Sequence, residues 1–386
     1  MNDIKFVCRK AIALYLLIII ACLTATAADN RYEQLDSAVQ ILMAKYEAIG
    51  ISVAVVKDNK QIYSHSWGLR DRESSIGLKD DDYFRIFSIS KSFIATAILQ
   101  LTEKHKLNLN DDVSNYLGRQ LRNPHFPEIP ITIEMLLSHR SSINDTQGYS
   151  KSFDILYPEN ANYTQSYDTI PPGSGYKYSN LNFNLLGAVI ENVTGTRFDH
   201  YIQTNILIPL GLHGFYDMAE SSGYDIAQAY QYKEENHTFQ HNASAYVCLP
   251  DSYVLGESTP LLSPCGGLKM SAVELAEYMQ MHMNLGKING KRVLRKHNER
   301  QMWTIRSPEN NYGLALIHYY DIIPEEELIG HRGGGYGINT SMFFNPKKKY
   351  GFVIFCNGIN TSLISHYQFH CILAKLLYDS IVTDFD

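Results

Sequence analysis

The chain has 386 residues, of which 45% are hydrophobic and 19% are charged. This is enough apolar sequence to bury a large core, and the length allows two lobes at most. The net charge is -6 at pH 7 and there is no long run of Lys or Arg, which argues against binding to nucleic acid or to an anionic membrane surface. The sequence therefore predicts a globular protein whose partners are small molecules.

The segment 1–27 has the pattern of a secretory signal peptide. Basic residues precede an apolar run at 11–23, and small residues at 25–27 suit cleavage after them. The apolar run is shorter than the ~20 residues that a membrane-spanning helix needs, which disfavours a retained anchor. Residues 19–22 also resemble a bacterial lipoprotein box, in which Cys22 would carry the lipid. We therefore expect an exported protein, periplasmic or attached to the surface of a bacterial cell through Cys22.

The residues after this leader predict a helix and then an antiparallel hairpin. Apolar residues at 33–48 recur at helical spacing, and 50–57 and 61–67 have the pattern of two strands joined by an Asp-Asn turn. A second helical period covers 88–105, where the apolar residues form one stripe.

The middle of the chain and its end differ in pattern. Up to about residue 259, loops rich in Pro, Gly, Asn and Tyr separate helical segments, which we expect at 133–138, 181–193 and 198–208. The end mixes both kinds of element, with helices at 271–285 and 362–380 and strands at 311–319, 338–344 and 352–357. The last two strands should form a hairpin across Asn345-Pro346.

These elements predict an α/β (α+β) fold in a single domain over 33–380. An antiparallel sheet flanked by helices would be built from both chain ends, about 33–87 and 260–380. An all-helical lobe, about 88–259, would be inserted between them.

A serine and a lysine three residues apart, Ser88 and Lys91, stand where a strand-like segment gives way to a helix. This spacing puts both side chains on one helix face, and the free N–H groups of a helix N-terminus can stabilise an oxyanion. The alternative is that Ser88 only caps the helix. A protonated lysine in the first turn is destabilised by the positive end of the helix dipole. This effect and burial would both favour the neutral amine, which can act as a base. The same spacing recurs at Ser174 and Lys177, in a loop where no helix would align the pair.

Tyr178 and Asn180 stand between a Pro-Gly turn and the helix predicted at 181–193. A phenol at such a junction can relay a proton if nearby cations stabilise the phenolate, and Asn180 can both donate and accept hydrogen bonds around it. The alternative is that Tyr178 is a packing residue, as most of the 27 tyrosines would be, and that Asn180 caps the helix.

A third segment, His331-Arg332 followed by Gly333, Gly334 and Gly335, precedes a predicted hairpin. Successive glycines at a strand edge let a ligand approach the backbone and leave N–H groups free to bind it. His331 can titrate near neutral pH, and Arg332 can bind a carboxylate bidentately. The alternative is a glycine turn with a surface His-Arg pair.

Together and in this order, the three segments resemble the serine β-lactamase and penicillin-binding-protein superfamily, whose signature is S-x-x-K, a Tyr- or Ser-centred triplet and K-T-G. The variant here, Ser-x-x-Lys, Tyr-x-Asn and His-x-Gly, is similar to the class C branch and its esterase and D-aminopeptidase relatives. The resemblance covers nearly all of 33–380. It is supported by further stretches at 136–139, 208–212, 263–268 and 312–314.

The resemblance implies a β-lactamase/transpeptidase-like fold with the site in a cleft between the lobes. Ser88 would be the nucleophile, with Lys91 and Tyr178 as its proton-handling partners. Those two would titrate as a coupled pair, so the sequence does not single out the base. Asn180 would contact the substrate, and the N–H groups of Ser88 and Gly334 would form the oxyanion hole.

One departure from the family pattern concerns the third motif, which usually begins with a lysine that binds the carboxylate of β-lactams or peptides. This chain has His331, expected in the catalytic site, and a neutral imidazole would bind a carboxylate less well. Arg332 could compensate, together with Gly333 at the substrate, although neighbouring residues of a strand point to opposite faces. We therefore expect esterase, amidase or peptidase chemistry rather than antibiotic hydrolysis.

The leading prediction is a serine hydrolase that cleaves a small ester, amide or peptide through an acyl-enzyme on Ser88. In an acyltransferase, an alcohol or amine would intercept that acyl-enzyme before water does, held by aromatic residues near the cleft. The sequence is also compatible with a D-Ala-D-Ala carboxypeptidase or β-lactamase, and with an acylated binder or sensor that does not turn over. It leaves the choice among these functions and the oligomeric state open.

No spacing typical of a zinc site occurs in the sequence, so we expect neither a metal nor another cofactor. Outside the leader stand Cys248, Cys265, Cys356 and Cys371. An oxidising compartment would permit up to two disulfides among them, with the connectivity open. The favoured interpretation is that they are small buried apolar residues.

Overall fold

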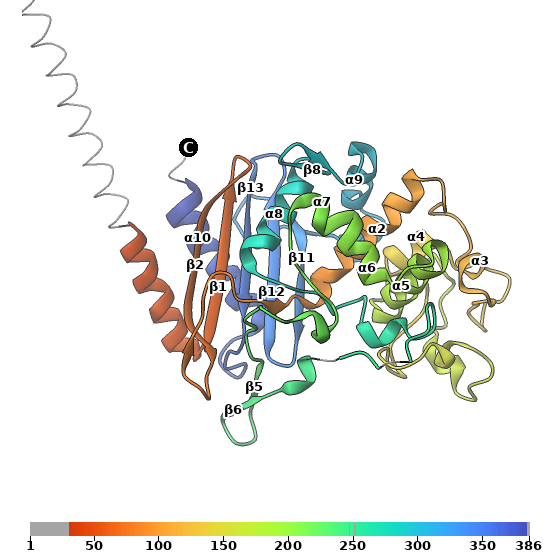
Figure 1. Cartoon of the computed structure of the whole chain (residues 1–386), viewed down its shortest axis with the longest axis horizontal. Coiled ribbons are helices and arrows are strands. Elements are labelled where there is room, and N and C mark those ends of the chain that lie inside the picture. The colour runs from red at the N-terminus through yellow and green to blue at the C-terminus, as the bar shows by residue number, and fades with distance from the viewer. Residues whose placement is uncertain (1–30, 247, 251, 384–386) are drawn as a thin grey trace, which may run out of the picture.

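The structure is a computed structural model that describes residues 31–246, 248–250 and 252–383 (Figure 1). The predicted signal peptide and Cys22 lie outside the described residues. The described chain begins with a helix over 31–46, which leads into the first strand of a large sheet. No helix of the described chain is long and apolar enough to cross a membrane.

A seven-stranded antiparallel sheet forms one half of the molecule, and its strands come from both ends of the chain. Its order is β10 (Ile317–Tyr319), β11 (Leu328–Gly335), β12 (Ile338–Asn345), β13 (Tyr350–Cys356), β1 (Gly50–Lys57), β2 (Lys60–Asp71) and β3 (Ile76–Gly77). The first and last long strands are direct neighbours, since Ile51 pairs with Cys356 and Lys57 with Tyr350. The predicted fold class, an antiparallel sheet built from both chain ends, is confirmed.

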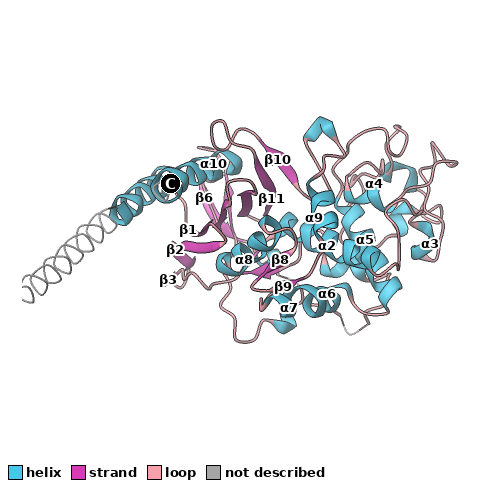
Figure 2. Ribbon diagram, turned by 90° about the horizontal axis from the view of Figure 1, so that it is seen from above, coloured by secondary structure: helices cyan, strands magenta, loops and turns pink. Residues whose placement is uncertain are grey.

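The central strands β12, β13 and β1 are buried along their whole length, and alternate residues of β1 belong to two different cores. Val53 and Val55 pack in a core with the helix over 31–46 and with α10 (His366–Leu377). Ala54 and Val56 face the other core, which includes α8 (Ala272–Met283) and the helical half of the molecule. Figure 2 shows α10 and α8 on opposite sides of the strands.

The helical half surrounds one central helix, α2 (Ser90–Glu103), which lies between the sheet half and α5 (Asn180–Thr194) (Figure 1). The sequence predicts a single apolar stripe here, but every residue from Ser90 to Leu101 is buried. The Phe93 ring, for example, stacks on Tyr278 of α8 at 3.7 Å between centroids. The remaining helices are α3 (Ser114–Leu117), α4 (Ile133–Leu137), α6 (Phe198–Ile202), α7 (Ile208–Leu210) and α9 (Lys296–Trp303).

Two segments differ from the predicted elements. The middle of the chain is not all-helical, because β5 (Tyr230–Lys233) and β6 (Thr238–His241) form a hairpin there. Its alternating aromatic and polar residues are a strand pattern too short to stand out. The strand predicted at 311–319 is reduced to β10, since the chain turns before it with positive φ at Asn311 and Ala315. Short ladders complete the fold: β4 (Phe84–Arg85) with β7 (Lys269–Met270), and β8 (Lys287–Ile288) with β9 (Lys291–Arg292).

The four cysteines outside the leader are free thiols. Cys265 and Cys356 are buried, as the favoured interpretation of small apolar residues predicts, whereas Cys248 is exposed and Cys371 half-buried. The structure therefore forms none of the disulfides that an oxidising compartment would permit among them.

Candidate active site

Ser88 lies in a single 3₁₀ turn, Phe87–Ile89, between the end of β4 and the start of α2. Its side chain caps neither helix, so the capping interpretation is wrong. Phe87 has φ of 47°, a left-handed conformation that costs a bulky residue on the order of 1–3 kcal/mol. Close packing holds this turn in place. The Thr340 hydroxyl donates to the Ile86 carbonyl at 2.9 Å.

Three side chains predicted from separate segments meet at the serine hydroxyl. Lys91 Nζ donates to Ser88 Oγ at 2.9 Å, and the Tyr178 hydroxyl donates to the same oxygen at 2.8 Å. The ammonium also lies 4.9 Å from the centroid of the Tyr178 ring. The S-x-x-K pair in the Pro-Gly loop is not built this way, because Ser174 is exposed and donates to the Pro171 carbonyl.

Lys91 is completely buried, and its nitrogen has two further acceptors, Asn180 Oδ1 and the Cys265 carbonyl, both at 2.8 Å. Those two oxygens can only accept, so they take hydrogens from Lys91 whether the amine is charged or neutral. The third substituent position of Lys91 Nζ points at Ser88 Oγ. In the neutral amine this position holds the lone pair. Burial lowers the pKa of Lys91 to about 8, which brings this neutral form within reach near neutral pH.

Tyr178 responds to burial in the opposite way, as an acid does. Loss of solvent raises the pKa of its phenol above the usual range, although the hydrogen bond with Ser88 opposes the shift. Tyr178 is therefore a neutral phenol in this site. It can donate a proton to an oxygen and receive one from another donor in the same step.

Asp145 fixes Asn180 and was not predicted from the sequence. Its carboxylate accepts hydrogen bonds from Asn180 Nδ2 at 2.9 Å, from the backbone N–H groups of Asn180 and Leu181, and from the Ser179 hydroxyl. These bonds cap the N-terminus of α5 and orient the amide, so that Asn180 Oδ1 faces Lys91. No local sequence signal marks Asp145, because it stands in a loop far from α5 in the chain.

With this geometry established, comparison with known proteins identifies the family. Residues 35–363 match the family model described as Beta-lactamase. The chain belongs to the Beta-lactamase family. With Lys91 and Tyr178 at the Ser88 hydroxyl, it is a serine hydrolase or acyltransferase.

Individual relatives agree with the family. Protein flp of Staphylococcus aureus (strain MRSA252) is 25% identical over 375 residues, which cover 90% of this chain and 69% of that protein. The octameric penicillin-binding protein homologue from Pyrococcus abyssi has a TM-score of 0.70 and 27% identity, covering 89% of this chain and 78% of that one. EstCE1, a hydrolase with promiscuous acyltransferase activity, has a TM-score of 0.72 at 20% identity, covering 91% of this chain and 99% of that one.

The third motif of this Beta-lactamase family member lies on β11, and His331 is buried there. Its Nδ1 is 2.6 Å from the Arg332 carbonyl, which can only accept, so Nδ1 carries the proton and Nε2 accepts from Tyr312 at 3.3 Å. Burial lowers the pKa of His331 to about 3, and the imidazole is neutral. Its ring lies 6.4 Å from the Tyr178 ring between centroids, and His331 is not among the residues that line the Ser88 pocket.

Arg332 and Gly333 do not reach the Ser88 pocket, so the expectation that they contact the substrate there is corrected. The Arg332 guanidinium lies over the Tyr367 ring of α10 at 4.1 Å, on the other face of the sheet, as strand alternation dictates. A side chain at Gly333 would meet the Ile86 carbonyl at 2.2 Å. This glycine therefore lets β11 pack against the turn that carries Ser88. Gly334, by contrast, lines the pocket with Ser88.

His139 is a second residue that the sequence did not single out individually. Its ring packs 4.2 Å from that of Tyr178 between centroids, and its Nδ1 accepts from the Ser179 N–H and the Asn182 amide at 3.2 Å. Burial lowers the pKa of His139 well below its usual value. The neutral ring fixes the position of Tyr178 from behind.

The Ser88 side chain opens into a pocket of about 640 Å³ with walls from both halves of the fold. Aromatic side chains at Tyr149, Tyr216 and Tyr336 line it, together with the backbone of Gly334 and the loop 260–267. The pocket therefore combines a nucleophile with apolar surface and a glycine strand edge.

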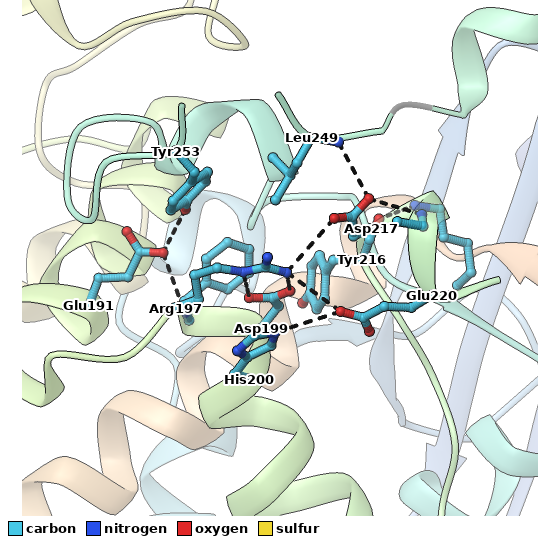
Figure 3. Close-up of polar contacts among 12 residues, drawn as sticks. Glu191, Arg197, Asp199, His200, Tyr216, Asp217, Glu220, Leu249 and Tyr253 are labelled. Atoms are coloured by element: carbon cyan, nitrogen blue, oxygen red, sulfur yellow. Dashed lines mark hydrogen bonds and ion pairs between the residues drawn. The ribbon is translucent and has the colours of Figure 1, made fainter. Parts of the chain in front are cut away.

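A separate charged cluster surrounds Arg197 in the helical half (Figure 3). The guanidinium donates to Asp199 at 3.0 Å and lies 4.0 Å from Asp217 and 3.5 Å from Glu220. Asp199, His200 and Glu220 could also offer metal ligands, because their ligand atoms lie within 4.8 Å of one another. Arg197 already supplies a positive charge to these carboxylates, so the cluster is an ion-pair network.

Proposed function

We propose that this protein hydrolyses a small ester or amide through an acyl-enzyme on Ser88. The observation that carries the proposal is the pair of hydrogen bonds to Ser88 Oγ, from Lys91 Nζ at 2.9 Å and from Tyr178 at 2.8 Å. A buried amine with a lowered pKa beside a serine hydroxyl is the arrangement that activates a weak nucleophile.

Acylation begins when neutral Lys91 takes the proton of the Ser88 hydroxyl. Oγ then attacks the carbonyl carbon of the substrate, and its oxygen becomes an oxyanion. The N–H groups of Ser88 and Gly334 are the proposed donors to that oxyanion, since both residues line the pocket. When the tetrahedral intermediate collapses, the bond to the leaving group breaks. Tyr178 delivers a proton to the leaving oxygen or nitrogen and is reprotonated by Lys91.

Deacylation repeats these steps with water as the nucleophile. Water gives its proton to Lys91 through Tyr178, its oxygen attacks the acyl carbon, and the acid product leaves as Ser88 regains a proton. Lys91 is the base in this scheme because its pKa falls toward neutrality, whereas the pKa of Tyr178 rises away from it.

Acyl transfer to an alcohol or amine is the second candidate function. The aromatic pocket wall at Tyr149, Tyr216 and Tyr336 favours it, because flat apolar surface can hold an organic acceptor and exclude water. The likeness to EstCE1, described as a hydrolase with promiscuous acyltransferase activity, points the same way. In this reaction the acceptor hydroxyl or amine replaces water in the second half of the cycle.

Carboxypeptidase or β-lactamase activity has weaker support. The third-motif His331 is neutral, buried and absent from the pocket lining, so it offers no charge to a substrate carboxylate. An acylated sensor would share the same first step and would differ only in failing to release the acyl group.

Intact-protein mass spectrometry tests the proposal. The mature chain and Ser88→Ala would be exposed to p-nitrophenyl esters, a D-alanyl peptide, a β-lactam, and esters with added alcohols. We expect a mass gain that requires Ser88 and survives Ser174→Ala. Release of acid identifies a hydrolase, release of a new ester a transferase, and a stable adduct a sensor. Labelling that persists in Ser88→Ala would refute the proposed nucleophile.

We also propose that the protein is exported, on the strength of the leader pattern in 1–27. The N-terminal residue of the protein made in a bacterial host would show it. Cleavage after residue 27 supports plain export, and a diacylglyceryl group on Cys22 supports a lipoprotein. A mature chain that keeps residues 1–27 contradicts both.

A further inference from the structure

The wall of the Ser88 pocket carries an excess of positive charge. Arg85, Lys151 and Lys269 line it, and no Asp or Glu is among the described residues that do. The whole chain has a net charge of -6, so this local excess does not follow from composition.

Arg85 points into this wall from β4, three residues before the nucleophile. Its guanidinium donates to the carbonyls of Gly266 and Ala245 at 2.7 and 2.8 Å and lies 3.4 Å from Ser263 Oγ. These neutral acceptors leave N–H groups of the guanidinium without an acceptor among the described residues. They also leave its charge without a carboxylate. Arginine is the side chain best suited to bind an oxyanion through two parallel N–H groups.

Lys269 is the direct cross-strand neighbour of Arg85, since the two residues pair in the β4–β7 ladder. It is buried, and its ammonium donates to the Tyr216 carbonyl without an ion pair to any described carboxylate. Like charges directly opposite each other in a ladder are destabilising. Burial and Arg85 lower the pKa of Lys269 to about 7, against the attraction of Asp217. The pocket therefore holds two neighbouring basic side chains, and neither forms an ion pair with a described carboxylate.

We propose that Arg85 and Lys269 form a binding site for an anionic group of the substrate, a carboxylate or a phosphate, beside Ser88. An oxyanion there would accept hydrogen bonds from the free N–H groups of Arg85, and its negative charge would offset the repulsion between Arg85 and Lys269. The proposal rests on the proposed function, because it names the class of ester or amide that the same pocket takes.

This site lies apart from the third motif. His331 is neutral and does not line the Ser88 pocket, and Arg332 lies over Tyr367 on the other face of the sheet, so neither supplies a charge there. β11 therefore offers no positive charge with which the pocket could bind an anionic group. Arg85 and Lys269 instead come from β4 and β7, and the Arg85 guanidinium lies 4.8 Å from the centroid of the Phe87 ring.

Matched pairs of esters test the proposal and locate the anion. One pair carries the charge on the acyl side, mono-p-nitrophenyl glutarate against p-nitrophenyl valerate. The other carries it on the alcohol side, 3-acetoxybenzoate against 3-tolyl acetate. We expect kcat/KM for the anionic member of at least one pair to exceed that of its neutral partner by about tenfold or more, the effect of one charge-assisted contact.

Two variants assign that preference to the site. Lys269→Met and Arg85→Gln should each reduce the anionic-to-neutral ratio to below about threefold, whereas Lys291→Met, which removes an exposed lysine of β9, should leave it unchanged. Lys269→Met keeps the shape of the side chain, so the test stands even if Arg85→Gln does not fold. A ratio near one in wild type, or a preference that survives both substitutions, overturns the proposal.

A binding measurement separates this proposal from the proposed function. Calorimetry with Ser88→Ala, which cannot be acylated, would titrate glutarate and, in a second arm, glycerol 3-phosphate. We expect one of them to bind and Lys269→Met to weaken it about tenfold or more. Neither anion binding would refute the site, even if neutral esters acylate Ser88. Binding without any acylation of wild type would support the site and refute the hydrolase.

Discussion

The Arg197 cluster and the Ser88 pocket differ in whether their basic side chains are paired with carboxylates. Around Arg197, carboxylates of three acidic residues lie within 4.0 Å of the guanidinium. In the pocket, Arg85 and Lys269 face each other across a ladder and donate only to neutral oxygens. The two regions are close in the chain, because Tyr216 lines the pocket and Asp217 belongs to the cluster. The half-buried Arg197 is paired and Arg85 is not, and this contrast is what the proposed anion site explains.

Lys91 is a further basic residue of the pocket region, completely buried, and its replacement should have the largest effect. We expect Lys91→Met to slow acylation by about 10²- to 10⁴-fold, the usual contribution of a positioned general base. In wild type the acylation rate should rise with pH and level off above pH 8, because neutral Lys91 is the active form and its pKa is about 8. Stopped-flow release of p-nitrophenol measures both. A pH-independent rate, or wild-type acylation in the variant, would remove Lys91 from the mechanism.

Removing the paired cation should damage the fold. Arg197→Met leaves Asp199, Asp217 and Glu220 without their counter-charge, which we expect to lower the free energy of unfolding by about 3 kcal/mol. Urea unfolding followed by circular dichroism would measure the change. An unchanged midpoint would mean that the carboxylates find other partners or are already protonated, and the contrast between the two regions would weaken.

Removing the unpaired cation should do the opposite. Lys269→Met replaces a buried, repelled ammonium by an apolar side chain of similar length, so we expect the free energy of unfolding to rise by about 1 kcal/mol. The same urea experiment measures it without any substrate. A marked loss of stability would show that Lys269 serves the fold, through Tyr216, more than it serves a ligand.

The smallest predicted effect is a pH dependence of that gain. The pKa of Lys269 is about 7 in the folded chain, well below the ordinary value of a lysine in an unfolded chain. The unfolded state therefore binds more protons between these two values, and the stability that this group contributes to wild type rises with pH. The advantage of Lys269→Met should be full below pH 7 and shrink toward about pH 10, where the lysine of the unfolded chain loses its proton. The charges that act on Lys269 are those of Arg85, Asp217, Glu220 and Cys248. If the stability gain of Lys269→Met did not change with pH, the titration of Lys269 would not be its cause.

The catalytic residues that lie in short sequence motifs could be predicted from the sequence. Ser88 and Lys91 are one helical turn apart, and Tyr178 follows a turn into a helix, so their local structure and their joint resemblance to a family were readable. The alternation of a strand also indicated that Arg332 turns away from the pocket. The hairpin of β1 and β2 and the terminal helix follow from periodicity alone.

The remaining parts of the site depend on contacts between distant segments. Asp145 orients Asn180 from a loop, the Cys265 carbonyl completes the environment of Lys91, and Arg85 meets Lys269 only because β4 pairs with β7. A backbone carbonyl leaves no mark in a sequence, and a ladder of two residues has no periodicity to detect. Gly333 also depends on a distant segment. The glycine pattern predicts a ligand beside it, whereas in the structure the turn that carries Ser88 packs there.

The neighbouring position of β1 and β13 has a consequence for how the protein is made. A ribosome would release β1 long before β13, yet Lys57 pairs with Tyr350 in the middle of the sheet. Until the final strands emerge, β1 has only its hairpin partner β2, and the sheet cannot close. Such non-local pairing makes folding slow relative to local helix formation. The edge of β1 that pairs with β13 therefore stays open until late in synthesis, and it is available to a nascent-chain binding factor until then.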